Sequence, residues 1–158
     1  FTSKKNRRLE GVSRTYLAII LAAGGELSGA RREAERAASV LVPHPPALAH
    51  ALAVLASVQV QLGVFGPART AAEKATRLLA ALGGVEEGEA MIRLAEAETL
   101  HALDETDAAR AAIAKAHARL VERASRINDD ALRGRFLRGV PENARTIELA
   151  RVWGVVPG

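Results

Sequence analysis

One stretch near the middle of the chain limits its fold most strongly: from Ala37 to Ala68 the sequence contains no Lys, Arg, Asp or Glu. Residues 46–61 are apolar at nearly every position, whereas residues 68–82 carry apolar side chains on one helical face only. A helix that is apolar all round is normally buried, because an exposed side would be polar. The sequence therefore predicts a buried helix paired with an amphipathic one, joined by residues 62–67 and flanked by further helices.

The composition favours an all-α fold. Apolar residues make up 49% of the 158 residues and charged residues 25%, as in a soluble globular domain. Only five residues are aromatic, and Ala and Leu supply most of the apolar surface. Close helix packing suits such a set better than a β-sandwich, whose strands favour β-branched and aromatic residues. We therefore expect one all-α domain over residues 1–158.

Apolar residues recur at steps of three and four along most of the chain, which is the spacing of amphipathic helices. Pairs of glycine or proline separate these segments, because both residues interrupt a helix. The pattern predicts three helical hairpins, at about residues 4–42, 46–83 and 86–127. Asp107 is expected to cap the last helix of the third hairpin. Two shorter capping helices should follow within residues 129–153, with Phe136 and Trp153 closing the core.

The three hairpins share an internal repeat. Its turn and second helix align in three sets with offsets of 38 and 41 residues: Gly25, Ala30, Ala34 and Ala37; Gly63, Ala68, Ala72 and Ala75; and Asp104, Ala109, Ile113 and Ala116. Each set combines a turn residue with mostly small side chains at fixed helical steps, where two helices can approach closely. Periods of this length indicate an array of helical hairpins, whose apolar faces are buried by stacking.

This pattern resembles the tetratricopeptide repeat, whose signature has glycine at the turn and alanine at two positions of the second helix. The resemblance implies antiparallel hairpins stacked as a superhelix. Two features depart from the family pattern. The position that usually holds a larger side chain is Ala34, Ala72 or Ile113, and Glu96 lies where an apolar residue is expected. We therefore regard the repeats as degenerate.

Two segments also resemble the repeat region of large bacterial serine/threonine protein kinases. Residues 124–146, ASRINDDALRGRFLRGVPENART, are similar to the C-terminal end of that region, and residues 6–18 are similar to one of its internal repeats. The resemblance implies a kinase domain in a larger protein, with this domain as a regulatory or partner-binding arm. Related repeats also follow ATPase modules in bacterial transcription regulators, which is the alternative parent.

The chain itself is expected not to be an enzyme. It lacks the kinase motifs, namely a Gly-rich phosphate loop, a His-Arg-Asp loop and Asp-Phe-Gly. It has no Cys, and its four His residues lack a metal-binding spacing. Glu96 and Glu98 lie roughly 200° apart around a helix and do not form a carboxylate pair. Glu86, Glu87 and Glu89 are expected in the first turn of the fifth helix, where the helix dipole stabilises them. We predict no catalytic, cofactor-binding or metal-binding residue.

The hairpin frame predicts a partner-binding groove instead. In tetratricopeptide folds the first helix of each hairpin lines the concave surface, and such grooves hold extended or helical peptides. Transferring this frame places eight residues near the groove: Tyr16, Ile19, Ala53, Ser57, Gln61, Leu94, Glu98 and His101. Gln61 is the most informative, being polar on an apolar helix, but Gln59 and Gln61 could equally bond solvent or loop carbonyls at the helix end. If the final helices fill the groove, the domain would be a structural spacer or a dimerisation module.

Charge is distributed unevenly along the chain, whose net charge is +4. Residues 1–14 hold five basic residues against one acidic residue, and residues 86–107 hold eight acidic residues against one basic residue. A nucleic-acid binder would need one broad basic face. We therefore expect a protein partner or the parent's own catalytic domain, with a homodimer as an alternative. Polar residues and flanking prolines argue against a membrane span at residues 47–63, and no signal-peptide pattern follows Phe1, so a cytoplasmic protein is expected.

Overall fold

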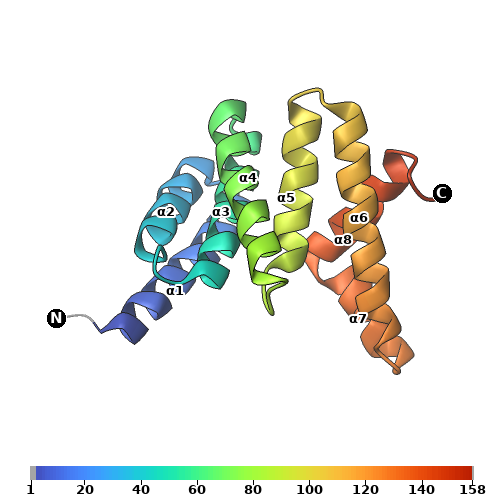
Figure 1. The fold of residues 1–158 in the computed structure, drawn as a ribbon, viewed down its shortest axis with the longest axis horizontal. Coiled ribbons are helices and arrows are strands. Elements are labelled where there is room, and N and C mark those ends of the chain that lie inside the picture. The colour runs from blue at the N-terminus through green and yellow to red at the C-terminus, as the bar shows by residue number, and fades with distance from the viewer. Residues whose placement is uncertain (1–2, 158) are drawn as a thin grey trace.

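Helical hairpins stack side by side in the computed structural model, which describes residues 3–157 and therefore excludes Phe1, Thr2 and Gly158 (Figure 1). Within that range the secondary structure is helical, with no strand. The eight helices of the described residues are α1 (Lys4–Ala23), α2 (Leu27–Val40), α3 (Pro45–Gln61), α4 (Phe65–Leu82), α5 (Glu89–Ala102), α6 (Thr106–Ser125), α7 (Asp130–Gly139) and α8 (Pro141–Val152). The predicted all-α fold of stacked hairpins is confirmed, because α1 pairs with α2, α3 with α4 and α5 with α6.

The turns of the three hairpins share one backbone conformation. Gly25, Gly63 and Asp104 have φ angles of +83°, +78° and +61°, and Asp104 is the only non-glycine residue within 3–157 with a positive φ. Glycine adopts this left-handed conformation without the steric penalty of a side chain, and aspartate tolerates it better than most residues. The offsets of 38 and 41 residues therefore align structurally equivalent turns, as the repeat predicted.

Small side chains line the interface within each hairpin. The nine repeated positions after the turns are all buried, with exposed fractions of 5% or less: Ala30, Ala34, Ala37, Ala68, Ala72, Ala75, Ala109, Ile113 and Ala116. In the first hairpin, a Cβ atom added at Gly11 would overlap the side chain of Leu41. The absence of a side chain at Gly11 thus lets α1 approach the end of α2 closely.

The first helices of the hairpins form the inner layer of the stack. α3 packs against α1, α2, α4 and α5, whereas α2 does not contact α4 and α4 does not contact α6 within the described residues. The second helices therefore splay apart on the outer side. This central position explains the composition of α3, where residues Ala51 to Ala56 are all buried. Although α3 is apolar, no helix in the described part of the chain is long and apolar enough to cross a membrane.

The two final helices close the C-terminal end of the stack. α8 begins at Pro141, a favoured first helical residue, and packs across α5 and α6, where it buries Leu149 and Ala150. Trp153 packs against the same apolar cluster, as predicted. The prediction for Phe136 was wrong: it is only half-buried, below the guanidinium of Arg123 at 5.3 Å, and α7 buries none of its residues. Within the described residues α7 packs only against α6 and α8, and the ring of Phe136 stays partly exposed.

Several predicted boundaries were wrong near the hairpin turns. α4 begins at Phe65 and includes Gly66 and Pro67, since proline is tolerated in the first turn, where its missing N–H would be unpaired. α5 begins at Glu89, after Gly88 at a φ of +92°, so Glu86 and Glu87 lie in the preceding loop and not in the helix. The residue before α6 is Glu105, and Asp107 lies inside the first turn.

Candidate functional site

A groove of about 430 Å³ lies on the inner side of the stack. It is lined by the first helix of every hairpin and by the start of α8: Ile19, Ala22, Val54, Ser57, Val58, Gln61, Met91, Leu94, Glu98, Pro141, Glu142 and Arg145. Seven of these twelve residues are apolar and five carry polar or charged side chains. A volume of several hundred Å³ with this lining is typical of ligand sites in proteins. We call this hollow the inner groove.

One edge of the inner groove is formed by two neutral polar residues of α3, Ser57 and Gln61. The Gln61 side chain is exposed, and its Nε2 donates a hydrogen bond to the backbone oxygen of Ser57 at 3.3 Å. A side-chain amide has two N–H donors and an acceptor oxygen. After this one bond to Ser57, Gln61 therefore retains a donor and an acceptor that can pair with the backbone of a bound peptide.

The opposite edge carries charge. Arg145 on α8 lies 3.8 Å from Glu98 Oε1 on α5 and 3.3 Å from Glu148 Oε1 in its own helix. Burial raises the pKa of Glu98, although the nearby Arg145 and His101 partly oppose this effect and Glu148 adds to it. Glu142 lines the same end of the groove. Among the lining residues, the two carboxylates of Glu98 and Glu142 against the one guanidinium of Arg145 give this end a net negative charge.

The structure brings five of the eight predicted groove residues together. Ile19, Ser57, Gln61, Leu94 and Glu98 all line the inner groove. They come from α1, α3 and α5, which lie far apart in the sequence and side by side in the stack (Figure 1). The transfer of the hairpin frame therefore located this hollow, while the binding role of these residues stays a prediction.

The other three residues lie elsewhere. Tyr16 is exposed and contacts His50 on α3, with the two ring centroids 5.9 Å apart. Ala53 is fully buried in the core, so it cannot line a surface. His101 stacks on Trp153 at 4.5 Å, because the segment after α8 covers the end of α5.

Sequence reasoning missed four of the lining residues that matter for the chemistry. Met91 lies one helical turn before Leu94, and that spacing could have identified it. Pro141, Glu142 and Arg145 belong to α8, outside the repeat, so the repeat frame had no position for them. α8 therefore forms one end of the groove without closing it.

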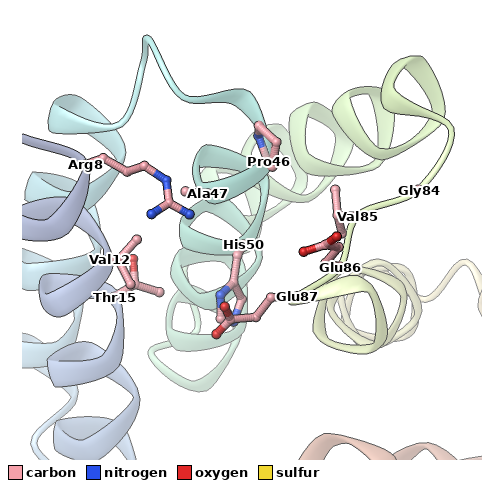
Figure 2. A pocket seen from close by; sticks show the side chains of 10 residues that line it. All are labelled: Arg8, Val12, Thr15, Pro46, Ala47, His50, Gly84, Val85, Glu86 and Glu87. Atoms are coloured by element: carbon pink, nitrogen blue, oxygen red, sulfur yellow. The ribbon is translucent and has the colours of Figure 1, made fainter. Parts of the chain in front are cut away.

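A second hollow, of about 360 Å³, lies between α1, α3 and the loop before α5. Figure 2 shows Arg8 on α1, His50 on α3 and the loop residues Glu86 and Glu87 around this cavity. Burial lowers the pKa of His50, so its imidazole is neutral at pH 7. A Cβ atom added at Gly88 would overlap the His50 ring. The loop therefore packs directly on His50.

The outer side of the stack holds a wider groove, of about 710 Å³, between α4 and α6. At one end the buried Glu89 carboxylate accepts hydrogen bonds from Arg93 Nε at 3.1 Å and Arg119 Nε at 2.8 Å. Burial alone would raise the pKa of Glu89, but the bonds from Arg119 and Arg93 outweigh burial and hold the pKa below its ordinary value. This ion-pair network ties α5 to α6 and explains Glu89 structurally.

In the described part of the chain, His, Asp and Glu side chains do not gather in any group of three that could hold a metal ion. Comparison of the chain with protein-family models, curated proteins and solved structures finds no match. The inner groove is thus characterised by its own geometry and chemistry.

Proposed function

We propose that this chain is a non-catalytic protein-interaction domain whose inner groove binds a peptide segment of a partner. The open groove between α1, α3, α5 and α8 carries this proposal. A spacer would need no hollow there, and its inner side would be packed shut. Five residues predicted from the hairpin frame line the groove, which also supports an interaction role.

The lining of the groove favours a particular ligand chemistry. Met91 and Leu94 offer an apolar floor, Gln61 can pair with peptide backbone, and Glu98 and Glu142 outnumber Arg145. Glu98 and Glu142 are partly buried, and a carboxylate that has lost part of its hydration gains from a cationic partner. The preferred ligand is therefore a segment with apolar side chains next to a Lys or Arg residue.

The resemblance to bacterial kinase repeat regions suggests where such a segment would come from. We propose that the domain is the repeat arm of a larger cytoplasmic signalling protein, a serine/threonine kinase being the favoured parent. The groove would then bind either a separate protein or a segment of the parent's own catalytic region. Residues 6–18 and 124–146 support this assignment through their sequence pattern.

The experiment selects peptides from a random library on the purified chain and measures their dissociation constants by fluorescence anisotropy. Ser57→Arg places a long side chain inside the groove and should weaken binding at least about tenfold. Glu98→Lys should weaken peptides with a basic residue by a similar factor. Ser39→Arg is the matched control, since Ser39 is exposed on α2, outside the groove.

The proposal predicts that selected peptides share an apolar core with an adjacent Lys or Arg. It also predicts that Ser39→Arg binds them like the parent chain. Equal affinities for the Ser57→Arg and Ser39→Arg variants would place the ligand elsewhere. Failure to select any peptide would favour a spacer role.

A further inference from the structure

Arg145 is the one basic side chain among the twelve that line the inner groove. Its Nε atom lies 3.8 Å from Oε1 of Glu98, across the boundary between α8 and α5. The preferred ligand inferred above carries a Lys or Arg residue, and the cationic group of that residue would bind the same carboxylate. The free chain therefore already holds a basic group where the basic group of the ligand would bind.

The contact between Arg145 and Glu98 leaves the carboxylate incompletely compensated. Its 3.8 Å separation is longer than the roughly 2.7–3.2 Å of an N–H to oxygen hydrogen bond, so the contact is an ion pair without a hydrogen bond. Burial keeps the pKa of Glu98 raised even with Arg145 beside it. The Glu98 side chain is 28% exposed, so a ligand can reach it. A cation that donates hydrogen bonds directly to this carboxylate would stabilise its charged form more than Arg145 does.

Arg145 has a second partner outside the groove. Its Nη1 atom lies 3.3 Å from Oε1 of Glu148, one helical turn further along α8, and Glu148 is exposed and does not line the groove. The Arg145 side chain is 44% exposed and can therefore turn towards Glu148 without leaving its charge unpaired. Displacing Arg145 from Glu98 costs little, because an exposed ion pair contributes little to stability.

The backbone of α8 is held on both sides of position 145. Asn143 and Thr146 are each 2% exposed, and Asn143 Nδ2 donates a hydrogen bond to the backbone oxygen of Phe136 at 2.9 Å. The helix itself lies across α5 and α6 (Figure 1). The Arg145 side chain can therefore change partner while α8 stays in place.

We propose that Arg145 competes with the ligand for Glu98: in the free chain Arg145 occupies the carboxylate, and a basic residue of the ligand displaces it onto Glu148. This inference rests on the proposed function, since it concerns the same groove and the same ligand chemistry. The competition lowers affinity and raises selectivity, because a segment without a basic residue cannot displace Arg145 and gains nothing from Glu98. Arg145 is thus a specificity-determining residue of the groove.

A pH titration of the glutamate carboxyl groups by NMR tests the contact in the free chain. Arg145 lowers the pKa of Glu98 against the effect of burial, so Arg145→Gln should raise that pKa further. Arg151→Gln is the matched control and should leave the pKa of Glu98 unchanged, because Arg151 is exposed on the same helix but does not line the groove. A Glu98 pKa that is the same in the parent chain and in Arg145→Gln would overturn the proposal, whatever the groove binds.

A matched pair of peptides tests the competition itself. The probe is acetyl-Leu-Leu-Arg-amide, and the control peptide replaces arginine by citrulline, which keeps its shape but carries no charge. In ¹⁵N NMR titrations, Arg145→Gln should lower the dissociation constant of the arginine peptide at least about threefold relative to the parent chain. The same variant should bind the citrulline peptide like the parent chain, and Arg151→Gln should bind both peptides like the parent chain.

The outcomes separate this proposal from the proposed function. Equal dissociation constants of the arginine peptide for the parent chain and Arg145→Gln would show that the groove binds peptides without competition from Arg145. An equal gain in Arg151→Gln would assign the effect to net charge and overturn the proposal as well. Absence of binding to Arg145→Gln, in which Glu98 is unobstructed, would also overturn the competition, while the library selection decides separately whether the groove binds another peptide.

Discussion

Glu96 is the residue that departs most clearly from its repeat position. Its equivalent in the second hairpin is the buried Leu55, yet Glu96 is half-buried and forms no ion pair within residues 3–157. Burial raises its pKa, and Lys115 and Arg93 oppose that shift only partly. The charged form is therefore less stable in the folded chain than in the unfolded chain.

This pKa shift predicts a pH-dependent stability difference. A carboxyl group with a raised folded pKa stabilises the fold below its unfolded pKa of about 4.3, and that contribution is lost as pH rises through the folded value. Glu96→Gln removes the charge, so at pH 7 it should stabilise the chain by up to about 1 kcal/mol. The gain should vanish below about pH 4, where Glu96 is protonated. Urea unfolding at both pH values measures the difference.

Glu87→Gln is the control for the Glu96 variant. Glu87 is exposed in the loop before α5, so removing its charge should change the free energy of unfolding little at either pH. A Glu96→Gln variant that is less stable than the parent chain at pH 7 would show that the carboxylate is favourably paired in solution.

At the scale of the elements, the turns join the two helices of each hairpin. Gly63 has a φ of +78°, whereas Gly66, three residues later, lies in the first turn of α4. A Cβ atom would meet no other atom within 4 Å at either position, so only the backbone conformation distinguishes them. Gly63→Ala should destabilise the chain by about 1–2 kcal/mol. Gly66→Ala should be neutral or stabilising, by up to about 1 kcal/mol.

Thermal unfolding of these two alanine variants measures the contrast directly. Equal melting temperatures would mean that the left-handed turn at Gly63 relaxes easily and that its backbone conformation contributes little to stability.

For the whole molecule, the repeat explains both what could be predicted from the sequence and what could not. The turn at Asp104 was predictable because Ala109, Ile113 and Ala116 follow it at the same steps at which alanines follow Gly25 and Gly63. The inner groove was predictable in outline, because the same frame placed Ser57 and Leu94 on one side of the stack. Both inferences depend on short-range helical spacing, which the sequence encodes directly.

The position of α8 was not predictable in this way. Its residues lie outside the repeat, so no internal equivalent shows which side of α5 and α6 they cover. The sequence therefore did not predict that Arg145 lines the groove beside Glu98, and the balance of charge at that end was not predicted either. The repeat frame also placed Tyr16 in the groove. In the structure Tyr16 is exposed on α1 and contacts His50 instead.

The most direct test of the proposed function is to map a selected peptide onto the folded chain by two-dimensional ¹⁵N NMR. The inner groove predicts that amide shifts change along α3, α5 and the start of α8, around Ser57, Leu94 and Arg145. Changes confined to the outer groove between α4 and α6, around Thr76, Ala108 and Lys115, would contradict the account.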